Sequence, residues 1–544
     1  METLIQTALD ADGVLLATID MPGRTMNVFS AGLMDALDTL MDRVDRDPAV
    51  RSVVLTSGKQ SFLAGADLAM VRGYCDAGER LMRAERRAAP KAARIPSGDR
   101  PTYPSGEGLS MNEQMFAMCG RLGRQMVRLE ASAKPWVAAV NGLALGGGLE
   151  LAMACRTRLV ADDPKIQLGL PEVRLGLLPG AGGTQRLPRF VGFELGMDLL
   201  LSGRPITPAT AVEAGLFERV VPAARLLDEA KAAARKLEGT PHDPAKKFAH
   251  LALADVPAHS AEAARAIALK HGVSPADFEL YPAYSAIVDS VLLGARQTLA
   301  EGTDTEMRQF LRLMFSPVAG NMVRTLFLNR QRADRELAAP EGLRIEKVSA
   351  GPISPARSAW ASAFGKAKLA LDDDIALPAD TIELFDNSGA RHRLTARVLA
   401  DAADAREPDG PFAVLTPNGP FGSVLEIAGA DDACAAAMAA LAQRLRALPY
   451  RTRATTSMLL EQARANRDDA DAQALAALTR ASTTFTGDTD FYDVAACVAG
   501  VTPAWSGGPF THLWREHTRL APRFDAAQSA AWTRIEPLLR KARA

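Results

Sequence analysis

The chain has 544 residues, a formal net charge of −1 at pH 7, and 48% hydrophobic residues. This length is enough for several domains with sizeable cores. The near-zero net charge gives no electrostatic reason to expect nucleic acid or an anionic membrane surface as a partner.

Cysteine usage and hydropathy indicate the cellular compartment in which the protein is expected. The five cysteines are scattered without C-x-x-C spacing, which is typical of buried thiols in a reducing compartment and indicates neither a disulfide framework nor a zinc site. The most apolar run, residues 136–149, is too short and too interrupted by glycine to span a bilayer. The first residues lack a positively charged and apolar secretory signal. We therefore expect a cytoplasmic protein without an integral membrane segment.

The first 200 residues alternate β-branched runs with helical patterns, which predicts an α/β unit. The run 53–56 is expected to be a buried strand, and the small residues at 64–66 would leave its exit open to a ligand. Residues 74–108 are polar, basic and proline-containing, which is typical of a solvated helix and loop. From residue 205 to about 335 the pattern is helical.

A triple glycine at 146–148 is followed by Glu150. Glycines allow a ligand to approach the backbone N–H groups, and a helix beginning here would direct its free N–H groups at a developing negative charge. A Glu in the first turn of a helix is also favourable for capping alone. The motif by itself therefore has both a catalytic and a structural interpretation.

A second carboxylate, Glu172, follows Pro171 and precedes a glycine-rich turn at 176–183. Proline and glutamate at a helix start are common for structural reasons. Taken together, however, Glu150, Glu172 and the exposed amides make an acid/base pair next to an oxyanion hole. Such a set is suited to chemistry beside a carbonyl group.

Three ordered motifs closely resemble the enoyl-CoA hydratase (crotonase) superfamily: AGAD at 64–67, NGLALGGGLELAMAC at 141–155, and LGLPEVRLGLLPGAGGTQRLPR at 168–189. The two glutamates are 172 − 150 = 22 positions apart, a spacing similar to that in α-subunits of multifunctional fatty-acid oxidation complexes. The resemblance implies an α/β fold with a crotonase (ββα spiral) N-terminal domain. It also implies an acyl-CoA thioester as substrate.

The same resemblance assigns roles to individual residues. The N–H groups of Ala66 and Gly147 would hold the thioester oxygen, while Glu150 and Glu172 would share the attacking water, with Glu172 as the acid. The substrate-binding loop for CoA would comprise residues Ala64, Ala66, Asp67 and Leu68. The basic segment 74–108 has a second interpretation on this basis, as a lid that meets the CoA phosphates.

Past the catalytic motifs, residues 281–283 and 316–330 look like the connecting helices of those multifunctional proteins, which lead into a 3-hydroxyacyl-CoA dehydrogenase. This chain departs from that pattern twice. Residues 349–355 contain two prolines and one glycine where a G-x-G-x-x-G turn is expected. No histidine lies between His392 and His512, although the resemblance would place the catalytic histidine near Val414. We expect a degenerate region that binds no NAD.

These observations predict four segments: a crotonase-type domain at 1–200, a helical connector at 201–338, a degenerate dinucleotide-binding-like region at 339–430, and a helical dehydrogenase-like region at 431–544. The expected function is hydration of 2-enoyl-CoA in fatty-acid β-oxidation, without a cofactor or a metal. A homo-oligomer and a thiolase subunit are the implied protein partners. Two alternatives stay open: Δ3–Δ2 enoyl-CoA isomerisation, which needs one essential carboxylate, and a largely structural α-subunit for a thiolase.

Overall fold

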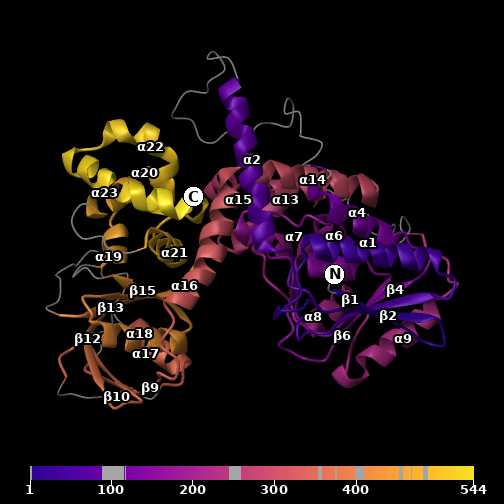
Figure 1. Ribbon diagram of the computed structural model, residues 1–544, viewed down its shortest axis with the longest axis horizontal. Helices are drawn as coiled ribbons and strands as arrows, with labels where there is room; N and C mark the ends of the chain where they lie inside the picture. Colours follow the sequence, from indigo (N-terminus) through magenta and orange to yellow (C-terminus); the bar gives the residue numbers. More distant parts are fainter. Residues whose placement is uncertain are drawn as a thin grey trace. The chain divides into compact units, whose positions relative to one another are not determined.

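The computed structural model describes residues 3–88, 116, 118–243, 259–352, 358–369, 371–373, 377–398, 410–452, 457–466, 469–481 and 488–543. The chain divides into two compact units, Met1–Gly320 and Asn321–Ala544 (Figure 1). The division falls inside the connector expected at 201–338. The physical reason is that the helices at 282–314 pack against helices of the catalytic motifs and so belong to the first unit.

The first unit is built on a six-stranded sheet with the order β1-β2-β3-β4-β6-β8. β1 and β2 form an antiparallel hairpin, and every other neighbouring pair is parallel. A second, two-stranded parallel sheet pairs β5 with β7. The strands are β1 (Ile5–Leu9), β2 (Val14–Ile19), β3 (Ser52–Ser57), β4 (Trp136–Val140), β5 (Ala144–Leu145), β6 (Thr157–Ala161), β7 (Leu168–Gly169) and β8 (Arg219–Val221).

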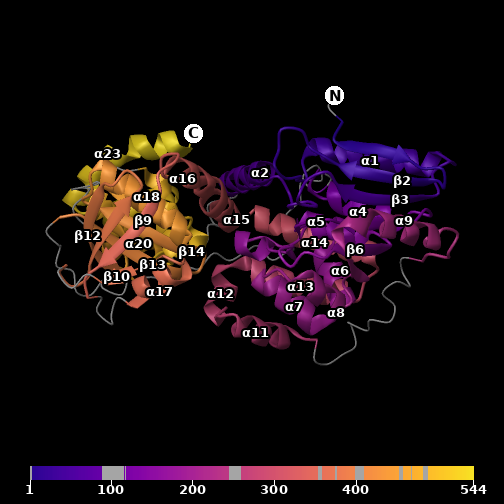
Figure 2. The ribbon, with the colours of Figure 1, turned by 90° about the horizontal axis from the view of Figure 1, so that it is seen from below.

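Helices flank this sheet in the first unit (Figure 2). They are α1 (Ala31–Arg46), α2 (Leu68–Ala88), α4 (Arg121–Glu130), α5 (Gly147–Ala154), η2 (Glu172–Leu175), α6 (Gly183–Val191), α7 (Phe193–Ser202), α8 (Pro208–Glu213), η3 (Ala223–Arg225), α9 (Leu226–Leu237), α11 (Ala261–Lys270), α12 (Pro275–Leu280), α13 (Pro282–Gly294) and α14 (Leu299–Met314). Helix α15 (Pro317–Met322) spans the division between the units.

The parallel strands explain the continuous apolar runs in the sequence. Every residue of β3 and β4 is buried, as expected for parallel strands that are covered on both faces. The strand predicted at 53–56 is thereby confirmed. Helix α9 packs along β2, β3, β4 and β6, and α14 begins at a capping box formed by Thr298 and Glu301.

The second unit contains a seven-stranded mixed sheet with the order β10-β9-β11-β12-β13-β14-β15. It starts with a βαβ arrangement in which β9 and β10 are parallel and α17 lies between them in sequence. The sheet crosses the boundary expected at residue 430, because β15 pairs in parallel with β14. Its strands are β9 (Ile345–Ala350), β10 (Leu371–Asp373), β11 (Thr381–Asp386), β12 (Arg391–Val398), β13 (Phe412–Gly419), β14 (Gly422–Ala428) and β15 (Ala447–Thr452).

Helices cover this sheet and continue to the end of the described chain (Figure 1). Trp360 and Phe364 of α17 and Met438 and Leu441 of α18 join the apolar core on one face. The helices of this unit are η4 (Val323–Asn329, a π-helix), α16 (Arg330–Glu336), α17 (Ser358–Lys366), α18 (Asp432–Leu445), α19 (Met458–Gln462), α20 (Ala470–Ala481), α21 (Thr489–Ala499), η7 (Ala504–Ser506), α22 (Pro509–Leu520), η8 (Ala521–Arg523) and α23 (Ala526–Arg543).

Within the described part of the chain, no helix combines the length and the apolarity that crossing a bilayer requires. Within the same residues, no group of three or more His, Cys, Asp or Glu side chains is arranged to hold a metal ion. All five cysteines are free and buried.

The glycine at 148 provides a test of the packing on which the catalytic motifs depend. A Cβ atom at this position would lie 2.2 Å from the carbonyl oxygen of Leu63, so a Gly148→Ala substitution must move backbone. We expect the substitution to lower the free energy of unfolding by about 1–3 kcal/mol or more, as overpacking does. Chemical denaturation measures the change.

Gly73 in α2 is the matched control, because a Cβ there would meet nothing within 4 Å. The Gly73→Ala protein should be as stable as the parent, or up to about 1 kcal/mol more stable, through helix propensity. Equal stability of the Gly148→Ala protein and the parent would contradict the close approach.

Candidate active site

Two chain segments lie side by side at the centre of the site. The segment after β3 runs parallel to β5: Leu63 and Ala144 form a bridge, and the Leu145 N–H donates to the Leu63 carbonyl at 3.1 Å. The two segments therefore deliver residue 66 and the N-terminus of α5 to the same place.

Two amide groups are left open there. Phe29 binds the neighbours of Ala66, since its N–H donates to the Gly65 carbonyl at 2.8 Å and its carbonyl accepts from the Asp67 N–H at 2.8 Å. Gly147 is the first residue of α5, where no intrahelical acceptor exists. Among the described residues, neither the Ala66 N–H nor the Gly147 N–H has a hydrogen-bond acceptor.

Gly146 fixes how closely these segments meet. Its φ of 52° lies in the left-handed region that favours glycine. A Cβ there would lie 2.5 Å from Glu172 Oε1 and 3.6 Å from the Gly65 Cα atom. Glu172, the 65–66 backbone and the start of α5 thus converge on one point.

The other residues expected to bind substrate have their own contacts. The Ala64 N–H donates to the Asn27 carbonyl at 2.9 Å and is therefore occupied. Asp67 accepts from the Ala69 N–H at 3.0 Å at the start of α2, and it forms an ion pair with Arg24 at 2.8 Å. Leu68 is the first residue of α2 and is partly buried. Most of the basic segment 74–108 lies outside the described residues.

Glu150 lies in the first turn of α5 with 2% of its surface exposed. Its Oε1 atom accepts from the Ala181 N–H at 2.8 Å and from the Gly183 N–H at 2.7 Å. Burial raises the pKa of this carboxyl to about 7, while the two amides and the Arg186 charge oppose the shift. Glu150 is thus held in one orientation and ionises near neutral pH.

Glu172 has a different environment. Pro171 precedes it at the start of the 3₁₀ turn η2, and its Oε2 atom is buried without a hydrogen-bond partner among the described residues. Burial raises the pKa of Glu172 well above its usual range, and repulsion from Glu150 and Glu306 adds to the shift. Three leucines close to Glu172 in the sequence, Leu168, Leu170 and Leu175, are all buried. The surroundings of Glu172 therefore favour its protonated form, whereas the two amides at Glu150 favour the ionised form.

The turn before α6 binds a third carboxylate. Glu306, a fully buried residue of α14, accepts from the Gly182 N–H at 2.5 Å and from the Thr184 N–H at 2.8 Å. The Thr184 hydroxyl donates to it at 2.5 Å. Glu306 was not predicted as a site residue from the sequence. The sequence feature that could have indicated it is a carboxylate in the buried stripe of an amphipathic helix, between Thr303 and Met307.

A buried ion pair supports the carbonyl side of the same turn. The Arg186 guanidinium donates to the Ala181 carbonyl at 3.0 Å and pairs with Glu130 at 3.0 Å. Both side chains are essentially inaccessible, at 0% and 1% exposure. Because each charge is buried, each depends on the other for compensation.

The arrangement supplies three chemical functions at one place. Two free amides can bind an oxygen that becomes negatively charged. Beside them are one carboxylate that is ionised near neutral pH and one carboxylic acid that remains protonated, which can accept and donate a proton respectively.

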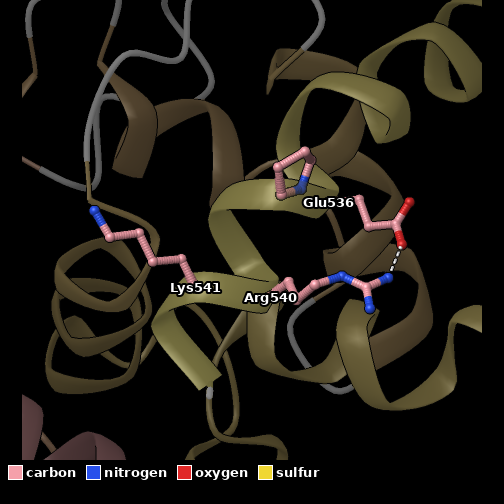
Figure 3. Close-up of a pocket in the computed structure, with 4 residues that line it drawn as sticks. Glu536, Arg540 and Lys541 are labelled. Carbon is pink, nitrogen blue, oxygen red and sulfur yellow. Dashed lines mark hydrogen bonds and ion pairs between the residues drawn. The ribbon is translucent and has the colours of Figure 1, made fainter.

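A surface hollow of about 450 Å³ lies on α23 in the second unit, lined by Glu536, Pro537, Arg540 and Lys541 (Figure 3). Arg540 forms an ion pair with Glu536 at 2.7 Å across one helical turn. None of the predicted site residues lines this hollow, so we assign no chemistry to it.

Residues 112–272 match the family model described as enoyl-CoA hydratase/isomerase. This part of the chain is therefore similar to that family. The match includes Glu150, Glu172 and the 181–184 turn, and the resemblance predicted from the three motifs is confirmed. The name of the family covers both hydration and isomerisation.

Curated relatives extend the match beyond this domain. The fatty acid oxidation complex subunit alpha of Idiomarina loihiensis is 35% identical over 342 residues, which are 62% of this chain and 42% of that protein. The subunit of the same name from Shewanella putrefaciens is 33% identical over 357 residues, 65% of this chain and 45% of that protein. The chain thus spans less than half the length of these relatives.

A crystal structure of enoyl-CoA hydratase from Bacillus anthracis is also similar, with 26% identity over 61% of this chain and 96% of that one. Its TM-score is 0.33, which is too low to support an argument about the fold. The similarity to the family therefore rests on the sequence matches.

The buried ion pair beside the turn gives a stability prediction. An Arg186→Met substitution should lower the free energy of unfolding by about 3–5 kcal/mol, because it removes the guanidinium that pairs with the buried Glu130 charge. Adding Glu130→Leu should recover most of this loss, since the double variant buries neither charge of this pair. Denaturant titrations of the parent, the single variant and the double variant measure both effects. A single variant as stable as the parent would show that the pair contributes nothing.

Proposed function

We propose that this chain adds water to the double bond of 2-enoyl-CoA thioesters, as an enoyl-CoA hydratase of fatty-acid β-oxidation. The observation that carries the proposal is a pair of carboxyl groups in different environments beside two free amides: Glu150 accepts two backbone hydrogen bonds, whereas the Glu172 Oε2 atom is buried without a partner among the described residues. Hydration needs all of these groups at once, since one proton must leave water and another must reach carbon.

In the proposed reaction the thioester carbonyl accepts hydrogen bonds from the Ala66 and Gly147 N–H groups. Ionised Glu150 takes a proton from water while the water oxygen bonds to the β-carbon of the enoyl group. Electron density moves onto the thioester oxygen, where the two amides stabilise it. Protonated Glu172 then gives its proton to the α-carbon, so that one C–O bond and one C–H bond have formed.

The contacts of the two glutamates support this division of labour. Glu150 accepts two backbone hydrogen bonds, which favour its ionised form. The Glu172 Oε2 atom has no donor beside it among the described residues, and burial there favours the neutral acid. Isomerisation from Δ3 to Δ2 requires one carboxylate to move a proton between carbons, so two buried acids favour hydration.

The first test replaces each glutamate by glutamine and follows the loss of 2-enoyl-CoA absorbance. We expect both Glu150→Gln and Glu172→Gln to lower the rate by about 10²–10⁴-fold, as is usual for general acid–base groups. In the parent, kcat/KM should rise with pH through about 7 as Glu150 ionises. It should fall at higher pH, where Glu172 loses its proton.

Both variants should bind the substrate as the parent does and should have the same free energy of unfolding as the parent. The parent protein is the control for both measurements. Near-parental hydration by either variant would remove that residue from the mechanism. If the parent leaves 2-enoyl-CoA unchanged but converts 3-enoyl-CoA, and Glu150→Gln retains that conversion, then the isomerase is the correct assignment.

We further propose that the second unit has no NAD-dependent dehydrogenase activity. The position at which the resemblance requires a histidine, Val414, lies directly opposite Glu426 across β13 and β14. Val414 is fully buried and packs with Leu460. The Glu426 carboxylate instead accepts from the N–H groups of Met458 and Leu459 at the start of α19, so it is engaged in capping a helix.

Pure protein supplied with a 3-hydroxyacyl-CoA and NAD should therefore produce no reduced nicotinamide, because the general base for hydride transfer is missing. Absorbance of reduced nicotinamide measures the reaction, and calorimetry with NAD alone measures binding. A hydratase assay of the same sample is the control for active protein. Reduced nicotinamide, or saturable NAD binding, would overturn this proposal.

We also propose a cytoplasmic location, which is supported by the five free cysteines. Assembly into a homo-oligomer, or with a thiolase subunit, is proposed on the likeness to the fatty acid oxidation complex subunits alpha. Light scattering of the purified chain, alone and with a thiolase, tests both assemblies.

A further inference from the structure

Four successive amides of the 181–184 turn are shared between two buried carboxylates. The Ala181 and Gly183 N–H groups donate to Glu150 at 2.8 and 2.7 Å. The Gly182 and Thr184 N–H groups donate to Glu306 at 2.5 and 2.8 Å. The donors alternate along the chain between the two carboxylates. Each carboxylate therefore fixes the orientation of peptide groups that lie between the ones bound by the other carboxylate.

The turn can share its amides between two carboxylates because it has glycine at positions 182 and 183. Gly182 has a φ of 95°, and a Cβ there would lie 1.8 Å from the Arg186 Nη1 atom. A Cβ on residue 183 would lie 2.8 Å from Glu150 Oε1. With no space for side chains at these two positions, the turn has one geometry in which both carboxylates are bound.

We infer that Glu306 is a positioning residue for Glu150, which acts by holding the 181–184 turn and by placing a second carboxylate against it. The inference rests on the proposed function, in which Glu150 is the base. Glu306 binds the opposite side of the turn, so its role is to fix where the Glu150 carboxylate lies and how readily it ionises.

Without Glu306, the Gly182 and Thr184 amides would be buried donors with no acceptor, which is costly. The turn would have to rotate to satisfy them, and the Ala181 and Gly183 amides would rotate with it. Glu150 would then lose the two contacts that hold its carboxylate. A misplacement of about 1 Å in a reacting group can cost about 10²-fold in rate.

The electrostatic effect follows from the same contacts. Burial raises the pKa of Glu306 to about 8, and repulsion from Glu150 contributes to the shift. Because this pKa lies above that of Glu150, Glu306 still carries its proton when Glu150 ionises. The Ala181 and Gly183 amides lower the pKa of Glu150, so losing these contacts when Glu306 is replaced should make Glu150 ionise at higher pH.

The other charged groups near Glu306 are few. Glu172 on η2 repels it in the same way. On α6 and α4, Arg186 and Glu130 neutralise each other in their buried ion pair. On α13, the ionisable residues are Tyr284, whose pKa is raised to about 12 by burial, and Asp289, which is exposed. Helix α2 meets α14 at its other end, where a Cβ on Gly78 would approach the Met314 carbonyl.

The test compares Glu306→Gln with Met307→Leu, a volume-conserving control at the adjacent buried position of the same helix. In Glu306→Gln, kcat for hydration should fall by about 10- to 100-fold with KM within about twofold of the parent. The acid limb of its pH profile should move to higher pH, because Glu150 loses amide contacts that lower its pKa. The Met307→Leu protein should match the parent in kcat, KM and pH profile.

A second measurement does not depend on catalysis. Infrared difference titration follows the protonated carboxyl band that disappears in Glu150→Gln, and its midpoint should move to higher pH in Glu306→Gln. If the parent has no hydratase activity, the proposed function fails, and this titration alone decides the inference. Parental kcat and pH profile in a folded Glu306→Gln protein, or an unchanged Glu150 midpoint, would overturn it. So would lower thermal stability with an unchanged pH profile.

Discussion

The catalytic part of this molecule depends on one constraint: buried carboxylates must be satisfied, and here the amides of a single glycine-rich turn satisfy two of them. Glu150 and Glu306 come from helices that are far apart in the sequence and meet at residues 181–184. An unpaired amide or carboxylate is expensive in a dry interior. The turn therefore ties α5, α6 and α14 together while it orients Glu150.

The same device stabilises the second unit. Glu426 in β14 accepts from the first amides of α19, and Asp493 in α21 accepts from the Phe510 and Thr511 N–H groups at the start of α22. Both carboxylates are fully buried. A negative charge at a helix N-terminus satisfies free donors and complements the helix dipole. Buried carboxylates therefore do not identify an active site by themselves.

What distinguishes the site in the first unit is an incomplete set of contacts. The Ala66 and Gly147 N–H groups and the Glu172 Oε2 atom lack partners among the described residues, whereas the carboxylates of Glu426 and Asp493 are saturated. Unsatisfied buried groups cost free energy, and proteins tolerate them where a ligand completes the set. A preorganised site combines supporting groups whose hydrogen bonds are complete with reacting groups whose hydrogen bonds are incomplete.

The sequence by itself determined the local chemistry, because short motifs carry it. Glycines at 146–148 and a carboxylate at 150 predicted an open helix N-terminus, and the buried strand at 53–56 was readable from its apolar run. Only the tertiary structure decided which distant groups meet these motifs. The contact of Glu306 with Gly182 spans 124 positions, and the pairing of Val414 with Glu426 depends on strand register. Local patterns set backbone conformation, whereas long-range packing sets which polar groups share a buried space, and that packing has no local sequence signature.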